Sequence, residues 1–78
     1  FIGDVTIEKD VIIGAGVVFC NYDGESKKLS SVGQGSILGS GSMIVSPVKI
    51  GSKVVIGAGS IVTKDLKDET RFIQKRYF

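Results

Sequence analysis

The chain has 78 residues, with ten Lys or Arg against eight Asp or Glu, a net charge of +2 and no histidine. This length allows one domain at most. The mild charge, with no basic run interleaved with aromatic residues, argues against nucleic acid as a partner. The longest strongly apolar run, residues 11–20, is too short to span a bilayer, which takes about 20 residues. We therefore predict one domain with neither a nucleic-acid nor a membrane partner. Because the chain begins with Phe1 rather than Met, we expect a piece of a longer protein.

The single cysteine and the missing histidine limit the possible chemistry. Cys20 alone excludes an internal disulfide and suits a reducing cytoplasm, and we interpret it as a small apolar filler. Without histidine there is no His-ligated zinc site and no Ser/His or Cys/His pair. We therefore expect no metal site and no complete active site in these residues, and composition alone predicts a scaffold.

An apolar residue recurs every six positions. It opens each unit, at position 1, and these residues are Phe1, Ile7, Ile13 and Phe19, then Val32, Leu38, Ile44, Ile50, Ile56 and Val62. Small or β-branched residues occupy position 5, at Ser36, Ser42, Val48, Val54 and Ser60. Such a six-residue repeat is typical of a parallel β-helix, whereas 11 glycines would destabilise an α-helix. Three units make one triangular coil, so we predict an all-β solenoid of about three coils over residues 1–67.

The repeat is interrupted once and ends before the C-terminus. Val32 follows Phe19 by thirteen residues, seven more than one unit. We assign residues 25–31 to a loop that leaves the stack, which is a common place for function, although a tolerated surface insertion is the alternative. After Val62 we expect a charged turn, and over residues 68–78 a strand or an extended tail.

Side chains at position 6, next to the inward position 1, should point outward. Ile12 and Val18 are such residues, while Val5, Val11 and Val17 take the inward position 5. An outward isoleucine in a thin stack indicates a subunit contact or a ligand cleft.

Several motifs occur in an order that is typical of one family. They are Ile13-Gly14-Ala15-Gly16, Phe19-Cys20-Asn21-Tyr22-Asp23-Gly24 with Lys27, Leu38-Gly39-Ser40, Val45-Ser46-Pro47-Val48 and Ile56-Gly57-Ala58-Gly59-Ser60. With them, residues 1–65 resemble the C-terminal half of the bacterial bifunctional N-acetylglucosamine-1-phosphate uridyltransferase / glucosamine-1-phosphate acetyltransferases. The Cys20–Gly24 block and the insert after it are the most specific part. The resemblance implies a left-handed β-helix and a homotrimer, with acetyl-CoA in the groove between adjacent prisms.

The resemblance also implies site residues. Contacts to acetyl-CoA would come from Ala15, Asn21, Tyr22, Ser40, Ala58 and Lys75, and contacts to glucosamine 1-phosphate from Phe1, Ile12 and Lys27. Ala15, Asn21, Ser40 and Ala58 all occupy position 3, which predicts that they line one outward seam. The family has tyrosine in place of Phe1, asparagine in place of Ile12 and arginine in place of Lys75, so the sugar side matches less well than the cosubstrate side.

The same resemblance implies direct acetyl transfer in UDP-N-acetylglucosamine biosynthesis, which supplies peptidoglycan and lipopolysaccharide precursors in the cytoplasm. The catalytic histidine would lie three residues before Phe1, so this chain holds no catalytic residue and we expect it to be inactive alone. Backbone N–H groups of residues 14–16 or the Asn21 side chain would stabilise the oxyanion. Mg²⁺ would belong only to the uridyltransferase domain, outside this chain. Two alternatives stay open: a non-catalytic trimerising module, and a hexapeptide acyltransferase with another acceptor.

Overall fold

Ten short strands wind the described part of the chain into stacked triangular coils. The structure, a computed structural model, describes residues 5–21 and 30–74, without the side chains of Asn21 and Ser46. The first coil holds β1 (Val5–Ile7), β2 (Ile12–Ile13) and β3 (Val18–Asn21), and the second holds β4 (Ser30–Val32), β5 (Ile37–Leu38) and β6 (Met43–Ser46). The third coil holds β7 (Lys49–Ile50), β8 (Val55–Ile56) and β9 (Ile61–Val62), and β10 (Arg71–Phe72) lies in a fourth.

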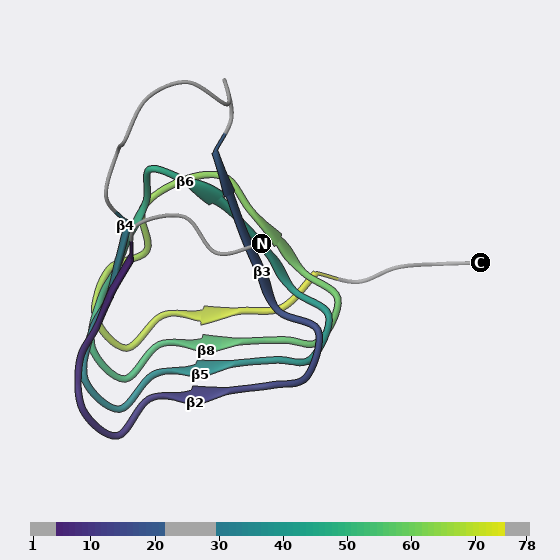
Figure 1. The fold of residues 1–78 in the computed structure, drawn as a ribbon. Coiled ribbons are helices and arrows are strands. Elements are labelled where there is room, and N and C mark those ends of the chain that lie inside the picture. The colour runs from purple at the N-terminus through teal and green to yellow at the C-terminus, as the bar shows by residue number, and fades with distance from the viewer. Residues whose placement is uncertain (1–4, 22–29, 75–78) are drawn as a thin grey trace.

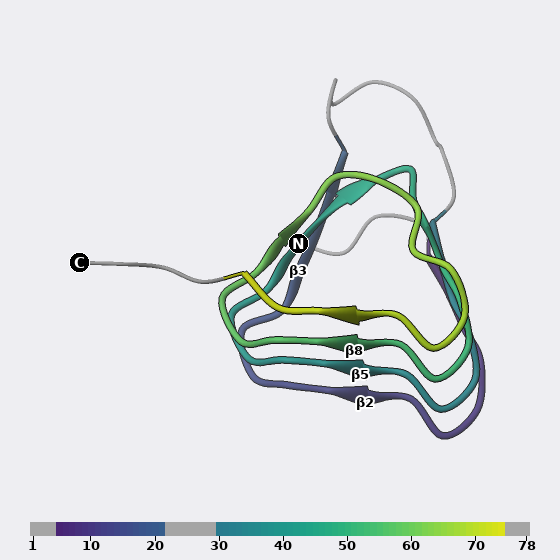
Figure 2. The same cartoon turned by 180° about the vertical axis from the view of Figure 1, so that it is seen from behind.

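The strands form three parallel sheets, one on each side of the triangle (Figure 1). Sheet one has the order β1-β4-β7, sheet two β2-β5-β8-β10 and sheet three β3-β6-β9. Figure 2 shows the same stack from behind, with β2, β5 and β8 lying one above another. The prediction of an all-β, left-handed parallel β-helix is confirmed.

Successive coils pair through the same positions of the six-residue unit. Ile13 pairs with Leu38, Leu38 with Ile56, and Ile56 with Phe72. The number of residues between paired positions differs from coil to coil. The step from Ile13 to Leu38 includes the seven extra residues, and the step from Ile56 to Phe72 is two residues shorter than three full units. A fourth coil begins where Leu66 bridges to Ile50, and the stack continues beyond residue 67 because β10 pairs with β8.

The predicted loop and the described strands differ at one point. Ser30 and Ser31, which we assigned to the loop at 25–31, lie in β4 and pair with Val5 and Thr6. The reason is that the unit must be counted backwards from Val32, which gives Ser30 the inward position 5. Its side chain is buried, and its hydroxyl accepts a hydrogen bond from Val48 N at 3.1 Å.

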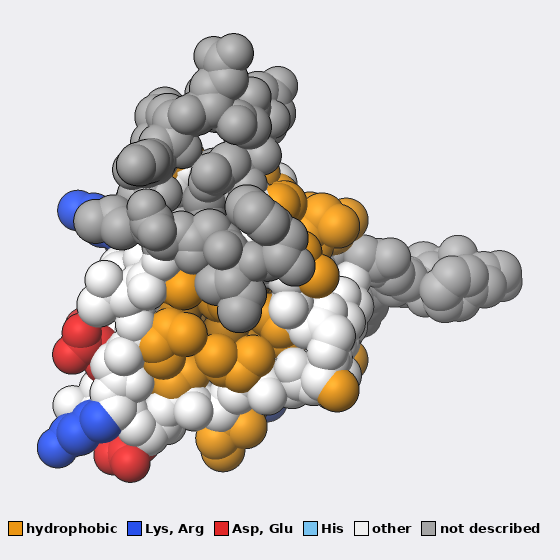
Figure 3. Space-filling model, viewed as in Figure 1, with side chains coloured by type: hydrophobic (Ala, Val, Ile, Leu, Met, Phe, Trp, Pro, Cys, Tyr) orange, Lys and Arg blue, Asp and Glu red, His pale blue; other side chains and the backbone are white. Residues whose placement is uncertain are grey.

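Position 1 supplies the core, as the repeat predicts. From Phe19 onward every described position-1 residue through Val62 is buried, and Leu66 in the short coil is buried as well. Ile7 and Ile13 of the first coil are each 42% exposed because no described residue lies below them. Figure 3 shows hydrophobic side chains gathered inside the triangle at this end.

Position 5 places serine hydroxyls inside the stack, where each hydroxyl needs a hydrogen-bond partner. Ser36 Oγ donates to Gly51 O at 2.8 Å and accepts from Val54 N at 3.1 Å. Ser42 Oγ donates to Gly57 O at 3.1 Å. Ser60 Oγ, equally buried, has no hydrogen-bond partner within the described residues.

Side chains of the fourth coil pair with the backbone of the third coil where strand pairing ends. Gln74 Oε1 accepts from Ile61 N at 2.9 Å, and Gln74 Nε2 donates to Ile61 O at 3.3 Å. The carboxamide therefore takes the place of a further strand beside β9. Asp65 Oδ1 similarly accepts from Lys49 N at 2.8 Å, at the edge of sheet one.

Candidate functional site

The three edges of the prism differ in the size of the side chains that they expose. The edge between sheets two and three, at the lower right of Figure 1, has Ala15, Ser40 and Ala58 at position 3, and all three are exposed. Glycine follows each of them, and we call this edge the small-residue corner. Its coils are tied together because Gly41 N donates to Ala15 O and Gly59 N to Ser40 O, both at 2.9 Å. Over three coils, no described side chain larger than that of serine projects from positions 3 and 4 here.

The edge between sheets one and two has the opposite character. Its positions 3 and 4 are Lys9–Asp10, Gln34–Gly35, Ser52–Lys53 and Asp68–Glu69, and we call it the charged corner. Figure 3 shows charged side chains gathered on this side of the molecule, at the lower left. An elongated ligand with a thin central part therefore finds room at the small-residue corner and not at the charged one.

The residues at the outward position 6 also differ in polarity among the three sheets. On sheet two it forms the register Ile12, Ile37 and Val55, and on sheet three Val18, Met43 and Ile61. On sheet one the same position holds Thr6, Ser31 and Lys49. The two sheets with apolar outer columns are the two that meet at the small-residue corner. Outer apolar columns of this kind mark interaction surfaces.

The predicted seam is assembled only in part. Ala15, Ser40 and Ala58 do lie one above another, but Asn21 ends β3 and pairs with Ser46 at the next edge of the triangle. The prediction that all four share one seam is wrong, because consecutive six-residue units lie on consecutive sheets and only every third unit stacks. Asn21 and Ala15 of one chain are thus at opposite ends of the sheet-three side.

The other predicted site residues divide between described and undescribed parts of the chain. Ile12 lies on β2 and is 60% exposed, the largest exposure of any large hydrophobic residue that the structure describes. Phe1, Tyr22, Lys27 and Lys75 lie outside the described residues.

The backbone donors proposed for an oxyanion are fewer than expected. Gly14 N donates to Leu38 O at 2.8 Å and is therefore already paired.

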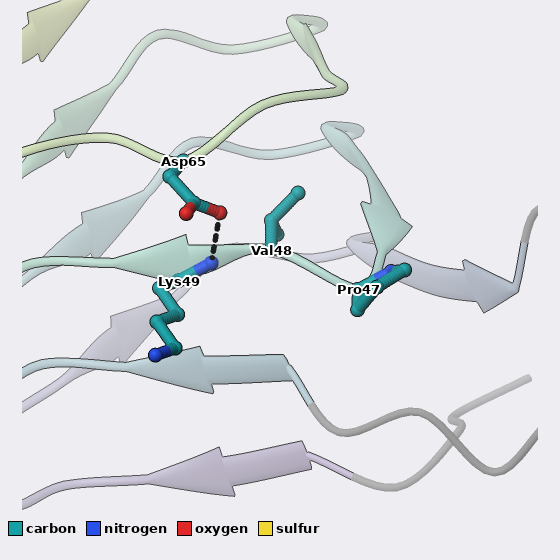
Figure 4. Close-up of a pocket in the computed structure, with 4 residues that line it drawn as sticks. All are labelled: Pro47, Val48, Lys49 and Asp65. Carbon is teal, nitrogen blue, oxygen red and sulfur yellow. Dashed lines mark hydrogen bonds between the residues drawn. The ribbon is translucent and has the colours of Figure 1, made fainter.

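A small hollow lies at the third edge, between sheets three and one. It is lined by Pro47, Val48, Lys49 and Asp65 and has a volume of about 200 Å³. Figure 4 shows the Lys49 side chain directed away from Asp65, whose carboxylate accepts from the Lys49 backbone. Because the fourth coil is two residues shorter here, it passes over this edge without filling it. The four described residues that line the hollow include no nucleophile–base pair.

The described residues meet the requirements neither of a metal site nor of a membrane-spanning helix. No group of three or more Cys, Asp or Glu side chains within residues 5–21 and 30–74 is arranged to hold a metal ion. Over the same residues, no helix is present that could cross a membrane.

The β-helix with its glycine-lined coils and small-residue corner has the architecture of a six-residue-repeat protein. The family model described as "Bacterial transferase hexapeptide (six repeats)" matches residues 30–64. The resemblance predicted from the sequence motifs is confirmed, since the chain is similar to bacterial proteins named "Bifunctional protein GlmU".

The similarity covers most of this chain and a small part of each relative. The GlmU of Alkalilimnicola ehrlichii is 48% identical over 69 residues, which are 88% of this chain and 15% of that protein. The GlmU of Bradyrhizobium diazoefficiens is 44% identical over 75 residues, 96% of this chain and 17% of the relative. The GlmU of Fervidobacterium nodosum is 45% identical over 69 residues, 88% and 15% respectively. The chain thus spans less than one fifth of the relatives that it matches.

Proposed function

We propose that this chain is the acetyl-CoA-binding part of a glucosamine-1-phosphate N-acetyltransferase in UDP-N-acetylglucosamine synthesis. The observation that carries the proposal is the stacking of Ala15, Ser40 and Ala58 at one exposed edge, in a chain that resembles GlmU over most of its length. The pantetheine arm of acetyl-CoA is thin and carries amide groups. It fits an edge that is free of large side chains and displays backbone polar groups. A cytoplasmic location is part of this proposal.

The proposed reaction is direct transfer. The amine of glucosamine 1-phosphate attacks the thioester carbonyl, its proton passes to a general base, and the CoA thiolate leaves. The base implied by the resemblance is a histidine that precedes Phe1. With Gly14 N paired to Leu38 O, the donors that remain for the oxyanion are the backbone N–H groups of residues 15 and 16 and the Asn21 side chain.

We further propose that the protein is a homotrimer whose site lies between neighbouring prisms. Two observations support this: sheets two and three carry apolar outer columns on both sides of the small-residue corner, and Met43 and Ile61 on sheet three are 42% and 41% exposed. In addition, Asn21 of one chain lies at the far end of sheet three from Ala15. The two residues therefore act on one acetyl-CoA only if they come from different subunits.

The test is release of free thiol from acetyl-CoA by the full-length protein, with and without glucosamine 1-phosphate. Ala58→Leu places a branched side chain on the small-residue corner and should raise KM for acetyl-CoA at least tenfold, a loss of about 1.4 kcal/mol in binding. Gln34→Leu is the matched control, because Gln34 is exposed at position 3 of the charged corner. Equal effects of the two substitutions, or sugar-independent release that Asn21→Ala leaves unchanged, would contradict the proposal.

A second candidate, transfer of the acetyl group to another acceptor, is favoured by one residue. Ile12 presents a 60% exposed apolar side chain on the first coil, the coil that carries Ala15 at the small-residue corner. Acetyl-CoA binding without any response to glucosamine 1-phosphate would support this candidate. A melting temperature that acetyl-CoA does not change would instead support a non-catalytic trimerising module.

A further inference from the structure

The outer face of sheet two carries an apolar surface beside the small-residue corner. Ile12 and Ile37 are paired in adjacent coils, and their side chains are 60% and 39% exposed. We call these two side chains the apolar shelf. The segments that hold it, residues 11–20 and 36–46, contain no charged residue. The apolar shelf therefore favours an uncharged, apolar group over a charged one.

The path from the apolar shelf to the small-residue corner is open in the two lower coils. Along the first coil, Ile13 takes the inward position 1, and Gly14 is the remaining residue between Ile12 and Ala15. Because glycine has no side chain, the strand is bare between these two residues. The second coil also has glycine at this place, Gly39. A group that lies against Ala15 can therefore extend across the strand to the apolar shelf.

The two upper coils close this path. In the third coil, the side chain of Ile73 lies over Gly57, whose added Cβ would be 3.3 Å from Ile73 Cγ1 and Cγ2. In the fourth coil, Arg71 pairs with Val55 and replaces the apolar residue of the outer column by a charged one. The open apolar surface is thus limited to the level of Ala15 and the coil above it.

The proposed trimer leaves the apolar shelf uncovered. In that trimer, the corner of one chain that carries Ala15 meets the edge of the next chain that carries Asn21. Both edges bound sheet three, so a closed ring of three such contacts places the three copies of sheet three around the symmetry axis. The outer column of sheet three is then buried between chains, whereas sheet two faces away from the axis. An apolar surface that subunit contacts leave exposed is typical of a ligand site.

An acetyl group is too short to reach the apolar shelf. Ile12 and Ala15 are three residues apart, or about 10 Å along an extended strand. A contact with Ile12 at about 4 Å leaves roughly 6 Å from a carbonyl carbon beside Ala15, about four bonds of 1.5 Å. The acetyl group has one carbon–carbon bond beyond its carbonyl. The apolar shelf therefore fits an alkyl group that lies several bonds from the reacting carbonyl carbon.

We propose that Ile12 and Ile37 bind an alkyl group, longer than the acetyl methyl, that one of the two substrates carries at its reacting end. This inference rests on the function proposed above. The alkyl group belongs either to the acyl chain of the donor or to a deoxygenated carbon of the amino-sugar acceptor. The bond changes stay the same: the amine forms a C–N bond with the acyl carbonyl carbon, the C–S bond breaks, and the amine proton passes to the base. A sugar hydroxyl held against the apolar shelf would lose water without gaining a hydrogen bond, which disfavours it.

The experiment measures kcat/KM of the full-length protein with two donors, acetyl-CoA and pentanoyl-CoA, and with two acceptors, glucosamine 1-phosphate and its 6-deoxy form. A buried methylene is worth about fourfold in binding. Ile12→Asn should therefore lower the ratio of the alkyl-bearing substrate to its counterpart about tenfold, whereas Ile12→Val should keep most of it. Ile37→Asn should act in the same direction. The matched control is Thr6→Asn, at the same outward position of the first coil on sheet one, which should leave both ratios within about twofold.

The outcomes separate this inference from the function on which it rests. A change in the donor ratio assigns the alkyl group to the acyl chain, and a change in the acceptor ratio assigns it to the sugar. If Ile12→Asn changes neither ratio, or dissociates the trimer in sedimentation experiments, the apolar shelf is not a substrate site. A protein that uses acetyl-CoA and glucosamine 1-phosphate but neither alkyl-bearing substrate also overturns only this inference. If the unsubstituted protein releases no thiol with any pair, the proposed function fails and the inference fails with it.

Discussion

Three buried serines at position 5 occupy equivalent sites of the fold but differ in the number of hydrogen bonds that their hydroxyls make. Ser36 Oγ makes two hydrogen bonds, Ser42 Oγ makes one and Ser60 Oγ makes none within the described residues. All three side chains are fully buried, so solvent exposure does not differ among them. Substitution of each serine by alanine removes the same single oxygen atom.

The loss of stability caused by each substitution should therefore follow the number of buried backbone groups that it leaves without a hydrogen-bond partner. Ser36→Ala strands the buried Val54 N–H and the Gly51 carbonyl, and should cost about 2–3 kcal/mol of unfolding free energy. Ser42→Ala breaks one bond and should cost about 1 kcal/mol. Ser60→Ala removes a buried hydroxyl that gains nothing from the fold, and should leave stability unchanged or raise it by up to about 2 kcal/mol.

Urea denaturation of the purified protein, followed by far-ultraviolet circular dichroism, measures these differences. In thermal unfolding, Ser36→Ala should lower Tm by roughly 10–20 °C, since a change of 1 kcal/mol shifts a domain of this size by about 4–8 °C. A Ser60→Ala variant that is as destabilised as Ser42→Ala would refute the reasoning. It would mean that oxygen removal itself, and not the loss of hydrogen-bond partners, sets the cost.

Three further predictions concern the edge strand and the two kinds of corner turn. Gln74→Leu leaves the Ile61 N–H and carbonyl at the edge of β9 without their hydrogen-bond partners. Light scattering during heating should therefore show aggregation at a lower temperature than in the unsubstituted protein. Gln74→Glu should give an intermediate aggregation temperature, because it keeps the acceptor for the Ile61 N–H. Gly41→Lys should cost about 1 kcal/mol in stability because of its φ of 73°, and should weaken acetyl-CoA binding by more than that. The reverse change at the charged corner, Lys53→Gly, should stabilise the protein by up to about 1 kcal/mol without affecting acetyl-CoA, which a stability assay and a binding assay check together.

Much of the fold follows from the sequence because the six-residue period fixes which side chains point inward. Position 1 and position 5 are determined by size and polarity, and the structure buries them as expected from Phe19 to Val62. The repeat was lost after Val62 because the next unit is two residues shorter. Leu66 and Phe72 still take position 1, and their six-residue separation was the available signal.

The candidate site was predicted less completely because it depends on the number of units per coil. Position 3 is exposed at both described corners, at Gln34 as well as at Ala15, Ser40 and Ala58, and the sequence alone treats Asn21 and Ala15 as equivalent. Only the pairing of Ala15, Ser40 and Ala58 through their backbones shows which of these residues meet.

The residues at position 4 of the two corners show whether glycine is needed there for the turn conformation or for the open space beside it. At the charged corner this position is Asp10, Lys53 or Glu69 with φ between 55° and 64° in three coils and Gly35 with a φ of 75° in the second, whereas at the small-residue corner it is glycine in all three described coils, with φ between 72° and 76°. Both corners therefore adopt the left-handed conformation, and the fold accepts large side chains in it at a cost of about 1 kcal/mol each. Turn geometry alone does not account for glycine at Gly41 and Gly59, where an added Cβ would meet no atom within 4 Å. The missing side chains leave open space along the outer edge, and that space is what the proposed acetyl-CoA seam requires.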